Sequence, residues 1–376
     1  MSKIEARRRR QLLISRKEAT KDGIARSHRL ITQLHGSNMA VSAGTPLDSA
    51  ALRSYLGSLV PSSTRSELTG SVLPALVHAI GDVSALLRRA HTVAHVGTAN
   101  AFGDQQLNVD IAADDVIRAA CKSCPSIVTA SSEETPIEET LRPNEGVTAS
   151  DAPSPSERYT VAYDPLDGSS IIAPNWTVGA IVGVWDGATA LGQNPRHSMV
   201  ASILGVFGPR TTAIVALRVP GIGEPTCFEL GIDGEFLTMV RPSIRFAPPP
   251  FKTRYFAPAN LRAAAECDKY NALVSHFIGQ KYTLRYSGGL VPDVVHALVK
   301  GHGVYISPTT PQSAAKLRRL YELSPIALVV ECAGGKAVDS SSGVEVLDVI
   351  ISDCDERGGV ICGNKDEVDL AMKLLE

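Results

Sequence analysis

The stretch Asp164-Pro165-Leu166-Asp167-Gly168-Ser169-Ser170 (DPLDGSS) is the most informative part of this sequence. Residues 159–163 (YTVAY), directly before it, are rich in β-branched and aromatic side chains and predict a β-strand. Mg²⁺ prefers carboxylate oxygens and often shares its site with phosphates, and backbone amides after a glycine can hold a phosphate. The stretch therefore predicts a metal and phosphate site at the end of a strand, although a plain Asp-Pro turn has a similar composition.

Two more acidic clusters precede this stretch. Glu133 and Glu134 follow residues 126–130 (SIVTA), which also predict a strand. Further upstream, residues 103–106 (GDQQ) lead to Asp110 at the start of a helix with apolar periodicity. Open α/β sheets bind their ligands at the carboxyl ends of the strands. We therefore expect the acids that follow the two strands to lie near each other.

Four motifs occur in a recognisable order: GDQQLNVD (103–110), SSEE (131–134), DPLDGSS (164–170) and KLRRLYE (316–322). They resemble the motifs of the class 1 fructose-1,6-bisphosphatase family of sugar bisphosphatases, and the resemblance extends from about Leu68 to the C-terminus. Four other stretches are more similar to the sedoheptulose-1,7-bisphosphatase branch of that family: 175–179 (NWTVG), 207–212 (FGPRTT), 259–263 (ANLRA) and 281–294 (KYTLRYSGGLVPDV).

The pattern of elements is that of an α/β protein in two lobes. Residues 67–89 have helical apolar spacing, residues 177–219 contain three apolar runs that predict a buried sheet, and Ser324-Pro325 predicts the start of a helix. The resemblance implies a layered α-β-α-β-α sandwich, the sugar phosphatase fold. Proline-rich residues 241–252 suggest a boundary between the lobes. We expect a partly helical, partly disordered N-terminal extension (1–64), a metal-binding lobe (65–245) and a sugar-phosphate-binding lobe (246–376).

The resemblance also implies a metal centre that holds two or three Mg²⁺ ions, for which Mn²⁺ could substitute. Its implied ligands are Glu133, Asp164, the Leu166 carbonyl, Asp167 and Glu322. Several carboxylates in one cleft would repel each other, and divalent cations remove that cost. Asp104, Asp110 and Glu134 would orient and deprotonate the attacking water. Taken alone, Asp110 would instead be interpreted as an acid that stabilises a helix N-terminus.

The substrate would bind through small, neutral and cationic residues. The implied contacts are Gly168, Ser169, Ser170, Asn260, Arg285, Tyr286, Lys316 and Arg318. Arg285 would reach the site of a neighbouring subunit, so we expect a homodimer or a homotetramer. From the residues alone, Lys316, Arg318 and Arg319 could instead form a solvated basic helix face, and Tyr286 could be a core aromatic with a bonded hydroxyl.

The resemblance implies an enzyme, a phosphoric monoester hydrolase. It would hydrolyse the 1-phosphate of sedoheptulose 1,7-bisphosphate to give sedoheptulose 7-phosphate and phosphate. A gluconeogenic fructose-1,6-bisphosphatase or a dual-specificity bisphosphatase is the alternative, because one carbon of chain length changes only the depth of a pocket. A catalytically silent protein that binds sugar phosphates is a third interpretation, which the complete set of metal-binding acids disfavours.

Composition argues against several other classes. The net charge is −2 and aromatic residues make up 5% of the chain, so little in it attracts or stacks on nucleic acid. No apolar run approaches the ~20 residues that span a bilayer, and the basic block at residues 7–10 lacks the apolar stretch of a secretory signal. Seven scattered cysteines favour a reducing compartment. We expect the cytoplasm, with a plastid or a peroxisome-like organelle as the alternative.

Overall fold

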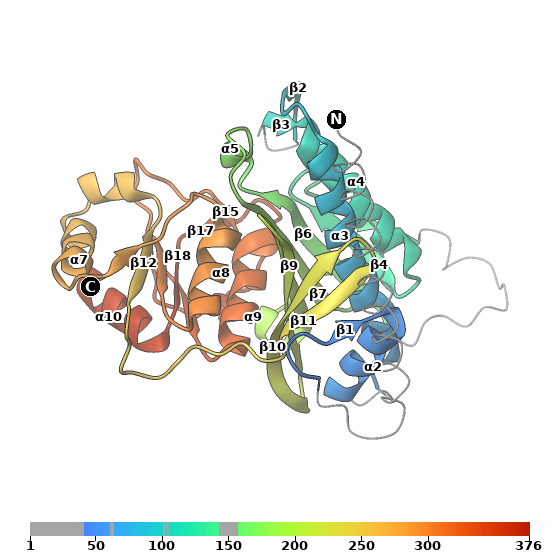
Figure 1. The fold of residues 1–376 in the computed structure, drawn as a ribbon. Helices are drawn as coiled ribbons and strands as arrows, with labels where there is room; N and C mark the ends of the chain where they lie inside the picture. The colour runs from blue at the N-terminus through green and yellow to red at the C-terminus, as the bar shows by residue number, and fades with distance from the viewer. Residues whose placement is uncertain (1–40, 61–63, 101–102, 104, 143–156) are drawn as a thin grey trace, which may run out of the picture.

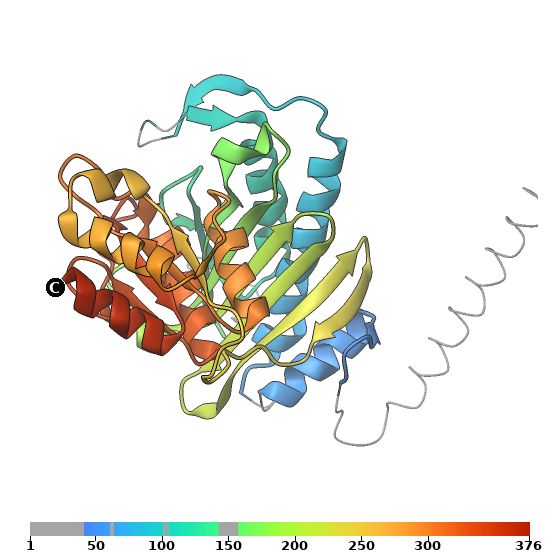
Figure 2. The same cartoon turned by 60° about the vertical axis from the view of Figure 1, so that its left-hand side comes forward.

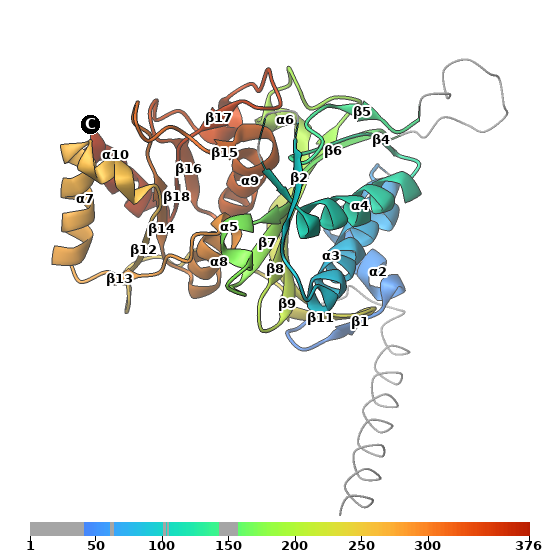
Figure 3. The same ribbon diagram turned by 90° about the horizontal axis from the view of Figure 1, so that it is seen from above.

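The computed structural model describes residues 41–60, 64–100, 103, 105–142 and 157–376. These residues form alternating layers of helices and sheets (Figures 1 and 3), which confirms the predicted layered α/β sandwich. The layers are, in order, helices α7 (Asp268–Gly279) and α10 (Lys365–Leu375), a five-stranded sheet, helices α8 (Leu290–Lys300) and α9 (Ser324–Cys332), a nine-stranded sheet, and helices α2 (Ser49–Leu59), α3 (Leu73–Arg89) and α4 (Asn108–Ser123).

The nine-stranded sheet carries the strands that were predicted from the sequence. Its strands are, in sheet order, β1 (Pro46–Leu47), β11 (Phe236–Arg241), β10 (Ile222–Asp233), β9 (Thr211–Val219), β8 (Met199–Phe207), β7 (Val178–Asp186), β6 (Tyr159–Asp167), β4 (Ile127–Ser132) and β5 (Glu139–Thr140). Neighbours run antiparallel except β4 and β6, which are parallel. Because β4 and β6 are adjacent and parallel, the acids at their carboxyl ends lie at the same edge of the sheet.

The five-stranded sheet is shorter and mixed. Its strands are, in sheet order, β13 (Thr283–Leu284), β12 (Tyr255–Pro258), β14 (Val304–Ser307), β18 (Val360–Gly363) and β16 (Lys336–Asp339). Two small ribbons pair β2 (His95–Ala99) with β3 (Gln105–Leu107) and β15 (Leu317–Arg318) with β17 (Arg357–Gly358). The β2–β3 ribbon stands out at one end of the molecule (Figure 2). The remaining short elements are α5 (Ser169–Ile172), α6 (Pro195–Ser198), η1 (Leu68–Val72), η2 (Leu261–Ala265), η3 (Arg319–Leu323) and η4 (Val346–Asp348).

Three apolar cores fill the spaces between the layers of the described residues. Alternate side chains of one strand enter different cores, because successive residues of a strand point to opposite faces. Val161 and Tyr163 of β6 pack on the side of α3 and α4, whereas Ala162 packs on the side of α8 and α9. In the third core, Phe256 stacks on Phe277 with ring centroids 5.2 Å apart. Helices on both faces therefore bury β6 along its whole length.

The long helix of the first core, formed by η1 and α3, starts at amides that donate hydrogen bonds to a carboxylate. Glu157, just before β6, accepts hydrogen bonds from the amides of Glu67 and Leu68 at 3.0 and 3.1 Å. The same carboxylate accepts a bond from the Tyr159 hydroxyl at 2.6 Å. A negative charge at this position satisfies amides that lack helical partners and interacts favourably with the helix dipole. The π-helical turn η1 then runs directly into α3.

This continuous helix, Leu68–Arg89, is the one among the described residues with the length and apolar composition to cross a membrane. We expected no such run from the sequence, but Asp82 is the single charged residue between Leu68 and Leu87. More than half of the apolar window is buried inside the structure, because the helix packs against α4, β8 and β9. A buried core helix can have the same length and apolar composition as a membrane-spanning helix, so these two features are weak evidence for a membrane span.

Residues 41–60 belong to the folded body, although we assigned them to the N-terminal extension. Strand β1 pairs with β11, and α2 buries Leu52, Tyr55 and Leu56 in the first core. The Tyr55 ring lies edge-on to Phe228 at 5.2 Å. Asp48 caps α2 by accepting a hydrogen bond from the Ala51 amide at 2.8 Å. Residues 1–40 lie outside the described residues, and the lobe boundaries stay predictions.

Candidate active site

An irregularity in β6 brings Asp164 and Asp167 together. Residues three apart in a regular strand point to opposite faces of the sheet. The pairing of β6 with β7 shifts register between Asp164 and Asp167, and Pro165 between them has no N–H to donate to a neighbouring strand. The carboxylate of Asp164 turns back to accept a hydrogen bond from the Leu166 amide at 2.9 Å. The local bulge therefore lets both acids face one site.

Glu322 joins these two acids from a distant part of the chain. Oxygen atoms of Asp164, Asp167 and Glu322 lie within 4.8 Å of one another, and all three side chains are buried. Burial raises the pKa of Asp164 and of Glu322 well above the usual range, and the charge of Glu133 adds to both shifts. Burial raises the pKa of Asp167 to about 6, although hydrogen bonds from Val291 and Leu290 lower it.

The donor set of this cluster fits a hard divalent cation. Three ionised carboxylates this close together repel each other, and the repulsion is strong because burial removes the screening water. Carboxylate oxygens are the ligands that Mg²⁺ and Mn²⁺ use in proteins. A bound divalent cation would offset the repulsion and keep all three groups ionised. The Asp164, Asp167 and Glu322 cluster is therefore the candidate metal centre.

Glu133, the fourth implied ligand, stands beside this cluster. Its amide donates a hydrogen bond to the Tyr163 carbonyl at 3.1 Å, so the end of β4 is tied to the end of β6. Its carboxylate accepts a hydrogen bond from Arg318 Nη1, and Arg318 Nε donates to Asp355 Oδ1 at 3.0 Å. The structure thus brings the four predicted carboxylates into one electrostatic environment, with Glu133 held by an arginine.

Glu322 lies in the π-helical turn η3, which leads straight into α9. We predicted that the helix starts at Ser324, with its side chain as the N-cap. Helix α9 does begin at Ser324, but the N-cap prediction is wrong: Leu323 stands at the cap position in a helical conformation, and the Ser324 hydroxyl is buried without a partner. The amide of Arg318 instead donates to the Glu322 carboxylate at 2.5 Å. Turns of this π type often occur at functional sites, where they displace a side chain from the regular helical pattern.

The predicted water-activating acids that the structure describes, Glu134 and Asp110, lie close enough to Glu133 for its charge to add to the rise that burial causes in the pKa of both. Glu134 accepts a hydrogen bond from Gln106 Nε2 at 2.6 Å, and burial raises its pKa to about 7. Asp110 accepts a bond from the Leu107 amide at 3.1 Å, and burial raises its pKa to about 6. Asp110 therefore also stabilises the start of α4, as the simpler interpretation held. Asp104 lies outside the described residues.

Asp114, one turn after Asp110 on α4, was not singled out from the sequence. It is buried and accepts a hydrogen bond from Arg118 Nε at 3.3 Å. Its Oδ1 atom and that of Asp110 have no hydrogen-bond partner. Residues four apart share one face of a helix. The four-residue spacing of Asp110 and Asp114 on the predicted helix could therefore have identified Asp114 from the sequence.

The predicted phosphate-binding segment begins with a left-handed turn at Gly168. Gly168 adopts φ 96°, a left-handed conformation that favours glycine. Ser169 and Ser170 begin the single-turn helix α5 directly after the metal cluster, and both are exposed. The turn therefore presents a short polar backbone segment beside Asp167.

The basic run 316–319 does not form a solvated helix face. Lys316 is exposed, but Arg318 lies in β15 and only 2% of its side chain is exposed. Arg319 donates to Asp339 at 2.5 Å. Asp355, which holds Arg318, was missed because it follows the predicted ligands by more than thirty residues and shares no motif with them.

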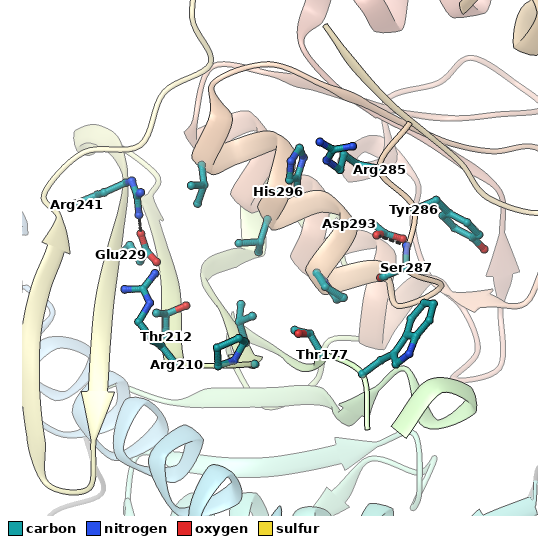
Figure 4. Close-up of a pocket in the computed structure, with 17 residues that line it drawn as sticks. Thr177, Arg210, Thr212, Glu229, Arg241, Arg285, Tyr286, Ser287, Asp293 and His296 are labelled. Carbon is teal, nitrogen blue, oxygen red and sulfur yellow. Dashed lines mark hydrogen bonds and ion pairs between the residues drawn. The ribbon is translucent and has the colours of Figure 1, made fainter. Parts of the chain in front are cut away.

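The other predicted substrate residues lie in two different places. Asn260 Nδ2 donates to the carbonyls of Pro308 and Ser313 at 2.7 and 3.0 Å. Arg285 and Tyr286 line a cavity of about 570 Å³ beside α8, together with Trp176 (Figure 4). Tyr286 is 46% exposed, so its interpretation as a core aromatic is wrong. The three clustered carboxylates do not line this cavity, which agrees with a role for Arg285 outside its own metal centre.

Family comparisons cover nearly all of the described chain. Residues 59–239 match the family model "Fructose-1-6-bisphosphatase, N-terminal domain", and residues 250–376 match "Fructose-1-6-bisphosphatase, C-terminal domain". The chain belongs to the fructose-1,6-bisphosphatase family. Its enzymes are phosphatases that hydrolyse phosphate monoesters, and metal dependence is general among them. The resemblance noted from the four motifs is thereby confirmed.

Relatives from both branches of the fructose-1,6-bisphosphatase family are similar to this chain. A chloroplastic sedoheptulose-1,7-bisphosphatase from Triticum aestivum is 39% identical over 284 residues, which cover 74% of this chain and 67% of the relative. One from Chlamydomonas reinhardtii is 36% identical over 321 residues, covering 81% of this chain and 77% of the relative. A class 1 fructose-1,6-bisphosphatase from Syntrophotalea carbinolica is 35% identical over 286 residues, covering 74% and 80%.

Solved structures of the family share the fold. A crystal structure of a Toxoplasma gondii protein assigned as sedoheptulose-1,7 bisphosphatase matches with a TM-score of 0.75 and 33% identity, covering 86% of this chain and 98% of that chain. The holo form of Leishmania major fructose-1,6-bisphosphatase matches with a TM-score of 0.73 and 25% identity, covering 88% and 99%. Both agree with the layered sandwich described above.

Proposed function

We propose that this protein is a Mg²⁺-dependent sugar bisphosphatase that hydrolyses the 1-phosphate of sedoheptulose 1,7-bisphosphate to sedoheptulose 7-phosphate and phosphate. The observation that carries the proposal is the buried cluster of Asp164, Asp167 and Glu322 in a chain of the fructose-1,6-bisphosphatase family. Relatives named sedoheptulose-1,7-bisphosphatase support the seven-carbon substrate. The 35% identity to a class 1 fructose-1,6-bisphosphatase favours fructose 1,6-bisphosphate as the second candidate substrate.

The residues of the site have separate tasks in this reaction. Asp164, Asp167, Glu322 and Glu133 would hold two or three divalent cations, with the Leu166 carbonyl as a further oxygen ligand. When bound, such cations neutralise the phosphate charge and lower the pKa of a bound water. Glu134 and Asp110 would accept the proton of the attacking water, as a base within hydrogen-bond reach must do, and Gln106 orients Glu134.

Phosphate recognition would use the remaining predicted residues. The Gly168–Ser170 turn directly after Asp167 would hold the reacting phosphate through its backbone amides, and Arg318 would add a positive charge beside it. Lys316 and Asn260 would contact the distal phosphate in the same chain. Arg285 would do so from the adjacent subunit of a homodimer or homotetramer, because it lines a cavity away from its own metal centre. Tyr286 would add a further phosphate contact.

Phosphate release from purified protein in Mg²⁺ distinguishes the two substrates. We expect kcat/KM to be about tenfold or more higher for sedoheptulose 1,7-bisphosphate than for fructose 1,6-bisphosphate, since one extra carbon unit in a fitted pocket is worth roughly that factor. The matched control is sedoheptulose 7-phosphate, which should release far less phosphate. Preference for the six-carbon substrate would contradict the seven-carbon assignment, and equal hydrolysis of the monophosphate would contradict a bisphosphatase.

Arg285→Ala should raise KM about tenfold or more and change kcat less, because a hydrogen bond to a charged group is worth roughly 1.5–3 kcal/mol and the distal contact persists through the reaction. Mixing this variant with inactive Asp167→Asn tests whether the site is shared. A hybrid dimer then has one site with both native residues, so turnover with the wild-type KM should reappear. Confirmed subunit exchange without any recovery would show that Arg285 acts within its own chain.

We also propose a reducing compartment, with the cytoplasm as the expected location. All seven cysteines are free, and six of them are buried. Burial raises the pKa of Cys121 to about 12, so this thiol of the Cys121–Cys124 pair is poorly ionised and slow to form a disulfide.

A further inference from the structure

Asp293, in the first turns of α8, holds the backbone of the segment that precedes the helix. Its Oδ1 atom accepts a hydrogen bond from the Ser287 amide at 2.7 Å, and its Oδ2 atom accepts one from the Gly288 amide at 3.3 Å. The side chain is 6% exposed. Arg285 and Tyr286, which come directly before these two amides, are both exposed and line the cavity beside α8 (Figure 4).

The N-terminal end of α8, which carries Asp293, is fixed by close packing and by hydrogen bonds. A methyl group on Gly179 of β7 would lie 2.4 Å from Cβ of Val291, so α8 packs against the sheet at a distance that only glycine permits. Asp167 accepts hydrogen bonds from the amides of Leu290 and Val291 at 3.1 and 2.7 Å. The start of α8 is therefore fixed both by the sheet and by an acid of the candidate metal centre.

The segment between β13 and α8 needs such an attachment. Gly288 has φ 104° and is followed by Gly289, and two glycines give the backbone wide conformational freedom. The side chain of Arg285 is exposed: Nη1 donates to the Leu284 carbonyl at 2.7 Å, and Cζ lies 5.7 Å from the Tyr255 ring. A loose segment would have to be ordered when substrate binds, which costs affinity.

We propose that Asp293 is a positioning residue: by holding the Ser287 and Gly288 amides, it sets Arg285 and Tyr286 in place for the distal phosphate of the substrate. This inference rests on the proposed function. It also links two sites, because one helix end is held by Asp167 of the subunit's own metal cluster and carries the acid that holds the Arg285 segment, which would serve the adjacent subunit's site. A purely structural acid would support the helix without affecting substrate affinity.

Hydrogen exchange measured by mass spectrometry tests the attachment without using activity. In Asp293→Ala, peptides that cover residues 285–289 should exchange about tenfold faster or more, because both amides lose their acceptor. Peptides from the C-terminal half of α8 should be unchanged. Faster exchange throughout α8 would mean that the helix itself depends on Asp293, and unchanged exchange at 285–289 would mean that the segment is held by other contacts. Either result would overturn the proposal.

Kinetics with the bisphosphate then tests the positioning role. Asp293→Ala should raise KM about tenfold while kcat and the Mg²⁺ requirement stay within about twofold, and Asp293→Asn, which keeps one acceptor oxygen, should lie between. The Asp293→Ala, Arg285→Ala double variant should have a KM well below the product of the two single effects, because both changes act on the Arg285 contact. The proposal would be overturned if the KM effects of the two changes multiplied in the double variant. It would also be overturned if Asp293→Ala lowered the melting temperature but left KM unchanged.

Glu138 offers a matched control in another part of the chain. Its carboxylate also holds two successive amides of a loop, those of Ala190 and Leu191, at 2.6 and 3.2 Å. Glu138→Ala should therefore lower stability and leave KM within about twofold, whereas Asp293→Ala raises it. Failure of the proposed function would be seen separately, as wild-type protein that releases phosphate from neither bisphosphate, while hydrogen exchange still reports on the attachment.

Discussion

Replacing Asp167 by Asn is expected to lower kcat by about 1000-fold or more while the protein stays folded. Metal stabilisation of developing charge in the transition state is worth several kcal/mol, and ~4 kcal/mol corresponds to that factor. Asp167 lies within 4.8 Å of Asp164 and Glu322, so the substitution removes one of three ionised ligands. It also removes one of the two hydrogen bonds to the start of α8, since an amide has a single acceptor oxygen.

The effect on stability should be small, because two terms oppose each other. Loss of one hydrogen bond costs about 1 kcal/mol, whereas removal of one carboxylate relieves repulsion in the metal-free cluster, where the pKa of Asp167 is raised to about 6 by burial. Thermal unfolding in chelator should thus give similar melting temperatures for the two proteins. Asp115→Asn, an exposed acid on α4, is the charge-matched control and should keep wild-type turnover. Near-normal kcat for Asp167→Asn in saturating Mg²⁺ would remove Asp167 from the metal centre.

Chelation should abolish activity reversibly, which is the second large effect. Wild-type protein treated with excess EDTA is expected to keep less than about 0.1% of its phosphate release, since the cations supply most of the charge stabilisation. Adding Mg²⁺ or Mn²⁺ back should restore turnover, because both are hard cations that accept carboxylate ligands. The melting temperature should rise on metal addition, as it does when a ligand binds only the folded state. Full activity in excess chelator would contradict a metal-dependent reaction.

The sequence predicted the parts of the site that local patterns determine. Strands that end in acidic clusters were evident at Glu133 and at Asp164, and the structure places these strands side by side and parallel. The three apolar runs between 177 and 219 became adjacent strands of one sheet. Such features depend on the period of apolar residues and on turn residues, which a single sequence displays directly.

Other features depend on contacts between distant segments and could not be predicted. The register shift between Asp164 and Asp167 arises in the pairing with β7. The π-helical turn at Glu322 precedes the helix that starts at Ser324, so the Ser324 side chain does not cap that helix. From the residues alone Arg318 could have been a solvated cation, but its partners Glu133 and Asp355 come from other parts of the chain. Local residue patterns contain no information on such partners, because they are set by tertiary packing.

The attachment of the Arg285 segment by Asp293 illustrates the same limit at short range. The sequence RYSGGLVPD places an acid four residues after a glycine pair, in the first turn of α8. Such an acid is ordinarily interpreted as one that interacts with the helix dipole. Only the folded backbone brings the Ser287 and Gly288 amides back over the carboxylate.

Manganese binding, followed by the electron paramagnetic resonance signal of free Mn²⁺, tests the proposed metal centre most directly. Wild-type protein should bind roughly two to three Mn²⁺ ions per chain in the presence of inorganic phosphate, as multi-metal phosphatase sites do, and Mg²⁺ should displace them. Asp115→Asn should bind the same number, and Asp167→Asn should lose at least one. Equal stoichiometry and affinity in Asp167→Asn and the wild type would contradict a metal centre built on Asp164, Asp167 and Glu322.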